Sequence, residues 1–544
     1  MGEEQAPSLG RRPLIPAPRL AHLKHPARTI LLSTAVGLLI ILWLLLKMSP
    51  VATPAKWDEC LMVYDAQRVL GGAVPYRDFF NFTPPAIFYA LAGWFRLWGS
   101  PATLTLGRGW ALVVALLSTW LCARALRRAA WPRGWAAGLA CLLPLGLFAF
   151  WPVPSHHWLG VVIWLASLEA YDFGEGKVRG AWGWVWIGAT GGAAFMTLQT
   201  TAVEMAVYWG VLWALGGQRR AQGSGWAALG VGLTAGASLL WFGGEGALNA
   251  WWNDTILWTA RSYSAAGGPN AVGLLADLPS RFGALWQRPE AVGRFPWLLW
   301  ALSGTLVYAG LVAAALFAIG LALFQLARIL RERRIGARLA SAAMALTFLD
   351  LALFLSGKTD LLHLVYVLGP VTVSWAMLGP PSYLSAPRGR RASAAALACA
   401  FAALTMFHLG FLLYHRPALW EFTDVDRPTR EAPVNTWLRA QPWLLPSDTV
   451  AAFPEGGQVY LYTRPAAVGY TLFQPLCDHL HTIRDHQIVA AQLEARKPRC
   501  IILTAERETD YLDPASPVAT VLRRDYVRYA LVADAVIYRR KGTP

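Results

Sequence analysis

The chain alternates between long apolar segments and short polar turns over most of its length. A transmembrane α-helix needs about 20 consecutive, mostly apolar residues. The segments that approach or exceed this length lie at about 30–49, 105–124, 134–152, 158–173, 180–197, 201–217, 224–243, 297–325, 338–356, 362–379 and 393–414. The pattern therefore predicts a polytopic α-helical membrane protein with about 11 transmembrane helices.

Two shorter apolar patterns lie between the first and second predicted helices, in residues 50–104. Residues 58–70 fit a helix lying at the membrane interface, because their apolar side chains share one helical face. That face carries Met62, Ala66, Val69 and Leu70, while Asp58, Asp65 and Arg68 lie away from it. Residues 85–98 are apolar but too few to span a bilayer, so we expect a re-entrant or interfacial helix. Residues 50–104 are thus predicted to form one large external loop packed on the membrane.

Three other parts of the chain depart from the transmembrane pattern. Residues 244–296 form a second large external loop, rich in Trp as interfacial segments are. Residues 1–28 are rich in Pro and Arg and are expected to be a disordered cytoplasmic segment. After residue 414 charged residues become frequent and no apolar run reaches membrane-spanning length. The transmembrane domain is therefore expected to cover 29–414, with a separate domain in 415–544.

This last domain is predicted to be a small external α/β domain. Clusters of β-branched and aromatic residues predict short strands, and residues 478–495 predict a helix between them. The strand sequences are DTVAAFPEG, QVYLYT, RCIILTA and ALVADAVIYRR. Cys477 and Cys500 could form a disulfide in this domain if its compartment is oxidising. The cysteines of the chain lack the spacing of a zinc site.

The formal net charge of +16 is a topology signal. Lys and Arg gather in alternate short turns, and the short turns between them carry almost none. Short loops rich in Lys and Arg stay in the cytoplasm, so the N-terminus is predicted to be cytoplasmic and the C-terminal domain external. We therefore expect a multi-pass protein of the plasma (inner) membrane, and no nucleic-acid partner.

Acidic side chains beside a membrane are costly unless something uses them. Asp58 and Glu59 open the first helix of the external loop, where a partly buried carboxylate could act as general base on a hydroxyl. The alternative is a solvated helix N-terminus, where Asp and Glu are common. Asp65 is expected to pair with Arg68 within its own helix. Asp78 either contacts a substrate or caps the turn before the NFTPP sequence.

The first external loop as a whole resembles that of the GT-C glycosyltransferases, polytopic enzymes that take a sugar from a polyprenyl-phosphate carrier. The similarity is to bacterial enzymes of the protein O-mannosyltransferase, aminoarabinose transferase and rhizobial galacturonosyltransferase type. It is close over residues 57–110 and topological over the rest of the chain. The shared pattern is an acidic pair, an aromatic residue, a Gly turn, PYRDF, a double proline, an aromatic helix and an Arg. In this chain these are Asp58-Glu59, Tyr64, Gly71-Gly72, Pro75 to Phe79, Pro84-Pro85, Tyr89 and Arg108.

The resemblance implies roles for several residues. Asp58 would be the base that takes the proton of the acceptor hydroxyl, and Glu59 would orient it or bind a cation. The aminoarabinose-type enzymes have a Lys just before the double proline, where this chain has Thr83. The cation that meets the departing phosphate is therefore sought elsewhere. The candidate substrate-binding residues are Tyr76, Asp78, Arg108, Arg261, Lys358, Asp360 and His363.

Some of these candidates also have a purely structural interpretation. Arg108 could pair with a carboxylate of the first loop, and Lys358 could anchor a helix end at the membrane surface. Asp360 and His363 stand close to Lys358 in a short external turn, which favours function there. Glu204 lies within an apolar segment and is a candidate on that ground.

Together these observations predict an integral-membrane glycosyltransferase. It would move a sugar from a polyprenyl-phosphate donor to an acceptor hydroxyl on the external face, by a single displacement that inverts the anomeric carbon. Its partners would be this donor, the lipid bilayer and an acceptor glycan, lipid or protein. No cofactor is certain, and a divalent cation stays open. The alternatives are a transporter or flippase of lipid-linked sugars, a polysaccharide polymerase or ligase, and a non-catalytic scaffold.

Overall fold

The computed structural model describes most of the chain from residue 57 onward. The described ranges are 57–99, 102–147, 151–173, 175–215, 220–263, 294–332, 338–356, 361–380, 386–415, 427–453, 457–466 and 483–542, with residues 283, 286 and 287. The first predicted transmembrane segment, 30–49, and the N-terminal segment 1–28 lie outside these residues.

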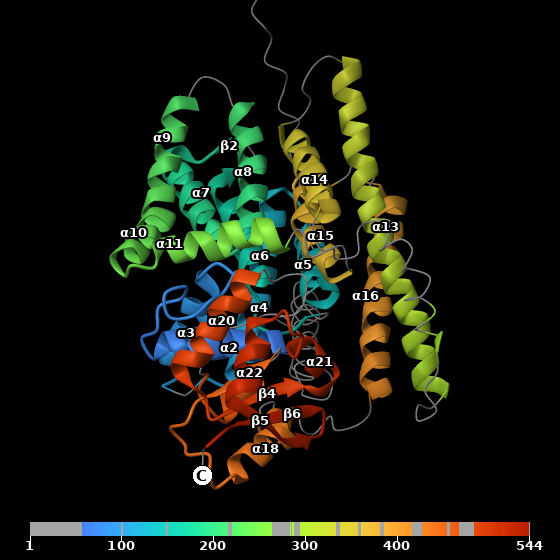
Figure 1. Ribbon diagram of the computed structural model, residues 1–544. Coiled ribbons are helices and arrows are strands. Elements are labelled where there is room, and N and C mark those ends of the chain that lie inside the picture. Colours follow the sequence, from blue (N-terminus) through green and yellow to red (C-terminus); the bar gives the residue numbers. More distant parts are fainter. Residues whose placement is uncertain are drawn as a thin grey trace, which may run out of the picture.

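Helices that run roughly parallel to one another make up the upper part of the molecule (Figure 1). In chain order they are α4 (Leu104–Arg128), α5 (Arg133–Leu142) with the π-helical turn η1 (Leu143–Leu147), α6 (His156–Ser167), α7 (Gly180–Phe195), α8 (Gln199–Ala214), α9 (Arg220–Val231) with η4 (Gly232–Gly236) and α10 (Ala237–Gly244), α13 (Arg294–Glu332), α14 (Arg338–Ser356), α15 (Leu361–Ala376) and α16 (Pro387–His415). Each predicted apolar segment from 105–124 onward overlaps one of them.

The structure is that of a mostly helical protein with apolar helices. Among the described residues, three helices are long and apolar enough to cross a membrane: Leu104–Arg128, Gln222–Gly244 and Trp297–Glu332. The helices α7 and α8 have 16 residues each, fewer than the roughly 20 of a typical span. The count of about 11 transmembrane helices therefore stays a prediction.

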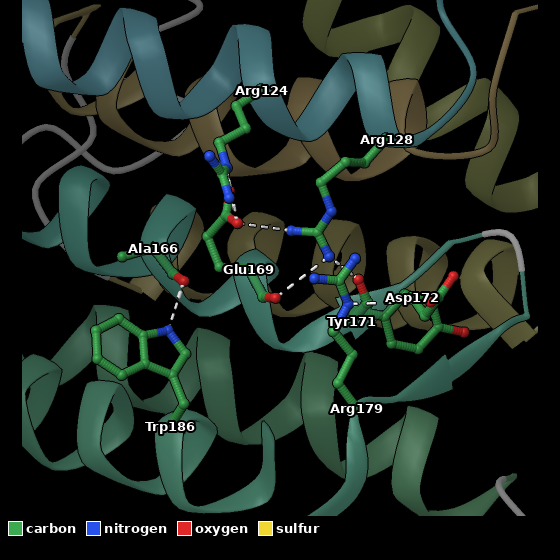
Figure 2. Close-up of polar contacts among 8 residues, drawn as sticks. All are labelled: Arg124, Arg128, Ala166, Glu169, Tyr171, Asp172, Arg179 and Trp186. Atoms are coloured by element: carbon green, nitrogen blue, oxygen red, sulfur yellow. Dashed lines mark hydrogen bonds and ion pairs between the residues drawn. The ribbon is translucent and has the colours of Figure 1, made fainter. Parts of the chain in front are cut away.

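Two of the basic turns lie side by side, held by charged contacts (Figure 2). Arg124 and Arg128, at the end of α4, both bond the carboxylate of Glu169 in the turn after α6, at 2.9 Å. Arg128 also donates to two backbone carbonyls of that turn. The turn continues into a short hairpin of β1 (Tyr171–Asp172) and β2 (Lys177–Val178). The turns that the charge pattern assigned to one side of the membrane are thus neighbours, and the side itself stays a prediction.

The C-terminal part of the chain forms a four-stranded sheet at the lower end of the molecule (Figure 1). Its strand order is β3 (Val450–Phe453), β4 (Cys500–Thr504), β6 (Ala535–Arg540), β5 (Tyr526–Val532). β3 and β4 are parallel, and the other two pairs are antiparallel. The helices of this part are α17 (Arg427–Arg430), α18 (Pro433–Ala440), α19 (Gly457–Tyr462), α20 (Ile483–Arg496), α21 (Glu508–Tyr511) and α22 (Pro517–Asp525). The mixed helix and strand content is that expected from the sequence, and β3, β4 and α20 fall in predicted segments.

One strand prediction was wrong. All of the predicted strand 458–463 except Thr463 lies in helix α19, which packs against the first loop. The Tyr460 hydroxyl accepts a bond from the backbone N–H of Ala452 at 2.8 Å, and its ring packs on Tyr64 with the centroids 5.4 Å apart. Ala466 takes the place beside β3 as an isolated bridge to Val450. These tertiary contacts outweigh the strand propensity of the local sequence.

The predicted strand 530–540 is divided into two. β5 ends at Val532 and β6 begins at Ala535, and Ala533 adopts a φ of +53° in the turn between them. Two-residue hairpin turns of this kind usually show Asn or Gly at such a position. The sequence lacks that signal, so the hairpin was not predicted.

Cys500 is buried in β4. Cys477 lies outside the described residues, so pairing of the two cysteines stays a prediction.

The first loop, whose external side stays a prediction, lies between the helices and the sheet (Figure 1). It contains α2 (Trp57–Leu70) and α3 (Ala86–Leu97), which pack on each other. Between them, Phe80 is 5% exposed and belongs to the hydrophobic core of the sheet, with Phe453, Ile501 and Leu503. The sheet thus completes its core with a side chain from the first loop.

Replacement of Phe80 by Ala should loosen the C-terminal sheet. Truncation of a buried Phe typically costs about 3–5 kcal/mol, and the loss here falls on both segments that share the core. We expect a lower thermal midpoint and faster limited proteolysis after residue 427. Leu531→Ala, at a side chain of β5 that is 59% exposed, is the control and should change stability by about 0.5 kcal/mol or less. An equal thermal midpoint and an equal proteolysis rate for the two variants would contradict the shared core.

Candidate active site

The helix that carries the proposed catalytic acid is α2. Asp58 and Glu59 occupy its first turn, where the helix dipole favours negative charge. Every residue from Glu59 to Ala66 is buried. Asp65, which the pattern placed away from the apolar face, is thus as buried as the apolar side chains, while Leu70 at the end of α2 is exposed. The position of α2 at the membrane interface stays a prediction.

Glu59 and Arg108 form a buried ion pair. The Nε and Nη2 atoms of Arg108 donate to the two carboxylate oxygens of Glu59, each at 2.7 Å. The Arg108 and Glu59 side chains are 2% and 0% exposed. Gly107 makes room for this contact, because a Cβ there would lie 3.0 Å from Cγ2 of Val63 on α2. Of the two interpretations of Arg108, the geometry favours the structural pair, and Glu59 has both oxygens engaged in it.

Asp65 is the acid whose surroundings differ most from expectation. Its side chain is fully buried, and its Oδ2 accepts a bond from Nδ2 of Asn81 at 2.9 Å. Its Oδ1 has no hydrogen-bond partner. Arg68 instead donates to the backbone carbonyl of Asp78 at 2.8 Å and lies over the ring of Phe79. The expected Asp65–Arg68 pair was thus wrong.

Burial changes the chemistry of Asp65. Desolvation raises the pKa of this carboxyl to about 7, while the nearby charge of Arg68 and the bond from Asn81 act in the opposite direction. A buried carboxyl with such a pKa is a common feature of functional sites, although structural networks produce it too.

Part of the cover over α2 comes from the C-terminal part of the chain. Helix α19 packs on α2. The hydroxyl of Tyr64 accepts a bond from the backbone N–H of Ala466 at 3.2 Å. This partner lies 402 positions away in the sequence, so the local amphipathic pattern had no means of showing it.

The PYRDF segment forms a tight turn closed by Asp78. The Oδ2 of Asp78 accepts from the backbone N–H of Val74 at 2.7 Å, and Arg77 binds both carboxylate oxygens at 3.0 Å. The bonds from Arg77 hold the pKa of Asp78 below its ordinary value. Arg77 also bonds Glu245, at the end of α10. Of the two roles left open for Asp78, the geometry favours the turn-closing one.

Tyr76 is held in a conformation that few residues adopt. Its φ is +71°, in the left-handed region that is strained for a bulky side chain. Its hydroxyl donates to the backbone carbonyl of Thr83 at 2.8 Å, and the backbone N–H of Thr83 donates to Oδ1 of Asn81 at 2.8 Å. Burial, followed by the carboxylates of Asp254 and Asp65, raises the pKa of the Tyr76 hydroxyl well above its ordinary value. Tyr76 is therefore a neutral donor that ties PYRDF to the segment before the double proline.

The second loop, residues 244–296, also packs against the first loop. It contains α11 (Leu248–Trp251) and the π-helix η5 (Trp252–Tyr263), a rare helix type that is frequent at functional sites. The Trp258 ring stacks on Phe82 with the centroids 5.2 Å apart and meets Phe80 edge-on at 5.4 Å. Arg261, one of the candidate cations, is exposed near the end of η5. Phe80 is therefore the point where the first loop contacts both the second loop and the C-terminal sheet.

The remaining candidate residues are not placed. Lys358 and Asp360 lie outside the described residues, and His363 lies in the first turn of α15 with its side chain outside them. A shared cavity between these residues and Asp58 stays a prediction.

Comparison with known proteins decides the fold. No protein-family model matches the chain, and no curated protein matches it significantly. The crystal structure of ArnT from Cupriavidus metallidurans bound to undecaprenyl phosphate aligns with a TM-score of 0.54 and 13% identity, over 94% of this chain and 98% of that one. The apo state of ArnT gives a TM-score of 0.52 and 15% identity, over 94% and 97%. The chain has the GT-C fold. An archaeal oligosaccharyltransferase, AglB from Archaeoglobus fulgidus, aligns less well, with a TM-score of 0.49.

Within this GT-C fold, two acidic side chains are buried on neighbouring helices. Glu204 on α8 is 7% exposed and Asp350 on α14 is 1% exposed, and the two helices pack together. The charge of Glu204 acts on Asp350, whose carboxylate oxygens both lack hydrogen-bond partners. The sequence analysis missed Asp350, although a charged residue inside the predicted segment 338–356 was a signal for it.

The described residues of the GT-C fold contain no group of three or more His, Cys, Asp or Glu arranged to hold a metal ion. His156 and His157 begin α6, and the ring of His157 stacks on Tyr366 with the centroids 4.0 Å apart. With Glu59 bound to Arg108, the described part of the first loop shows no ready cation site, and cation binding by the protein stays open.

The ion pair between Glu59 and Arg108 is expected to matter for stability. Glu59→Gln leaves a buried Arg charge without its counter-charge, which should cost about 3–5 kcal/mol in unfolding free energy. The double variant Glu59→Gln/Arg108→Met removes both charges and should recover most of this loss. Glu332→Gln, in an exposed pair with Arg328, is the control and should cost less than about 1 kcal/mol. Additive losses in the double variant would contradict the coupling.

Asp65 should make the stability of the protein depend on pH. Because the folded state raises its pKa from 3.8 to about 7, its stabilising contribution is full below about pH 4 and is lost as pH rises through 7. The shift corresponds to about 4 kcal/mol. Asp65→Asn keeps the acceptor for Asn81 and should flatten the profile, with a higher thermal midpoint than wild type above pH 7. The control is Asp534→Asn, in the exposed β5–β6 turn. If the stability of Asp65→Asn depended on pH as strongly as that of wild type, Asp65 would not be the source of the pH dependence.

Proposed function

We propose that this protein is a membrane glycosyltransferase that moves a sugar from a polyprenyl-phosphate donor to an acceptor hydroxyl on the external face. The observation that carries the proposal is the alignment with ArnT, captured with undecaprenyl phosphate, over nearly the full length of both chains. The acidic pair, PYRDF and double proline of the first loop support the same reaction class. The donor sugar and the acceptor, whether glycan, lipid or protein, stay open.

In the proposed reaction Asp58 is the general base. It removes the proton of the acceptor hydroxyl, whose oxygen bonds to the anomeric carbon of the sugar. The bond from that carbon to the phosphate oxygen breaks, and polyprenyl phosphate leaves with the electron pair. A single displacement of this kind inverts the anomeric configuration. The Glu59–Arg108 pair beside Asp58 supports the proposal, since it holds the first turn of α2 firmly against α4.

The negative charge on the departing phosphate needs a cation close to the membrane surface. Arg108 is 2% exposed and already bound to Glu59, so we propose Lys358 and His363 for this role instead. Arg261, exposed at the end of η5, is the remaining candidate. Tyr76 and Asp78 are proposed to shape the acceptor side through the PYRDF turn, and Asp360 to orient Lys358.

The reaction separates this proposal from its alternatives. A flippase of lipid-linked sugars would bind the same donor but would leave the sugar–phosphate bond intact. A polymerase or ligase would transfer a long glycan rather than a single sugar. Release of free polyprenyl phosphate, together with transfer of one sugar, would therefore support the glycosyltransferase and contradict the others.

Asp58→Asn tests the base. General base catalysis contributes roughly 10²- to 10⁴-fold, so release of polyprenyl phosphate from a polyprenyl-phosphate pentose or hexose should fall by about that factor. The assay uses the full chain in lipid nanodiscs with a panel of acceptors, and Asp534→Asn is the matched acid-to-amide control. Full transfer by Asp58→Asn would overturn the assignment of the base, whereas an inactive wild type with every donor would overturn the proposed function.

A further inference from the structure

An apolar cavity lies between the helices, away from the external loops. It has a volume of about 360 Å³ and is lined by residues of α4, α5 with η1, α13, α15 and α16. Thr372 is the one lining residue with a hydroxyl, amide or charged side chain, and the others are aliphatic apart from glycines and Cys122. The cavity is therefore unsuited to a sugar or a phosphate, which need hydrogen-bond partners when buried.

The cavity exists because small residues meet at this point. Gly146, Gly310 and Ala403 line it from three different helices. The helices α13 and α16 pack closely on each other, since a Cβ at Gly410 would lie 2.8 Å from the backbone nitrogen of Trp300. The pair of α13 and α16 therefore lies across the cavity from α4, while α16 touches α5 beside it, where a Cβ at Gly138 would lie 2.9 Å from Leu397.

The cavity also opens sideways, where the bilayer would be. Leu306 on α13, which lines the cavity, is 56% exposed. α4 and α13 both contain stretches long and apolar enough to cross a membrane, Leu104–Arg128 and Trp297–Glu332. Cavity-lining residues lie inside both stretches, so the opening faces the hydrocarbon region, where lipid chains and no water are present.

The volume limits what can fill the cavity. A cavity of about 150 Å³ holds one benzene ring of six carbons, so 360 Å³ corresponds to roughly 14 carbons by the same ratio. That is the length of one phospholipid acyl chain. A polyprenyl chain with several tens of carbons could place only part of its length there, and an α-helix, which is about 10–12 Å wide, does not fit.

We propose that this cavity binds one acyl chain of a membrane phospholipid, which joins the α13–α16 pair to the rest of the helices. Lipid tails are as apolar as the cavity wall, so the driving force is close packing rather than the hydrophobic effect. The lipid is thus a structural component of the membrane part and is distinct from the lipid-linked donor of the proposed reaction.

A cavity-filling variant tests the proposal. A side chain at Gly310 has free space, because no atom lies within 4 Å of a Cβ placed there. The full chain, purified in mild detergent, is examined by native mass spectrometry. Wild type should retain a phospholipid, and Gly310→Phe should retain at least tenfold less. Gly320→Phe, on the same helix with equally free space but outside the cavity lining, should retain it like wild type. Ala314→Leu provides a milder filling variant if Gly310→Phe fails to fold.

A second measurement links the lipid to structure. Adding phospholipid to delipidated protein should raise the thermal midpoint of wild type and of Gly320→Phe, and should leave Gly310→Phe unchanged. Equal phospholipid retention by Gly310→Phe and wild type would overturn the proposal. So would a wild type that retains no lipid, or a retained species with the mass of a polyprenyl phosphate that Gly310→Phe loses.

Discussion

The ion pair between Glu59 and Arg108 constrains everything around the candidate site. Removing two charges from water is expensive, and a buried pair recovers that cost only with close geometry and complete hydrogen bonding. Two bonds of 2.7 Å between side chains that are at most 2% exposed leave α2 little freedom to slide or rotate against α4. Asp58 precedes Glu59 directly, so the position of the proposed base along α2 is fixed by the same contact. Gly107 belongs to this constraint, since a larger residue there would keep the helices apart.

The first loop is also held in place by side chains that pack against the C-terminal sheet and the second loop. Phe80 completes the core of the sheet, while Trp258 of the second loop packs on Phe80 and Phe82. Tyr64 bonds the backbone beside α19. A loop that would be mobile on its own is therefore enclosed by the helices, the second loop and the C-terminal sheet. Catalytic groups need this kind of support from their surroundings, because small misplacements of a reacting group lower the rate strongly.

Local patterns in the sequence predicted the helices of this site, but they did not predict which residues pack around these helices. The 3.6-residue periodicity placed α2 and α3, and Arg108 was correctly considered as a partner for a first-loop carboxylate. The burial of Asp65 was not predicted, and the contacts that enclose its helix include α19, about 400 positions later. The same long-range contact turned residues 458–462 into a helix. Periodicity shows which side chains lie on the same face of a helix, but it does not show which faces become buried in the folded protein. Asp65 also shows a limit of charge patterning, since its partner is a neutral Asn81 rather than the basic residue one turn away.

The burial of Arg108 and the identity of Thr83 together restrict how the proposed reaction can be arranged. Thr83 stands where the aminoarabinose-type enzymes carry a lysine, and it is 1% exposed, with its backbone bonded to Asn81 and Tyr76. Neither Thr83 nor Arg108 is therefore free to meet a phosphate. In the proposed arrangement the first loop supplies the base and the acceptor side, and the turn between α14 and α15 supplies the cation for the phosphate. Such a division has a chemical advantage: the cation that meets the phosphate lies away from the base, whose proton affinity it would otherwise lower. The leaving group meets positive charge on the opposite side of the sugar, as an in-line displacement requires.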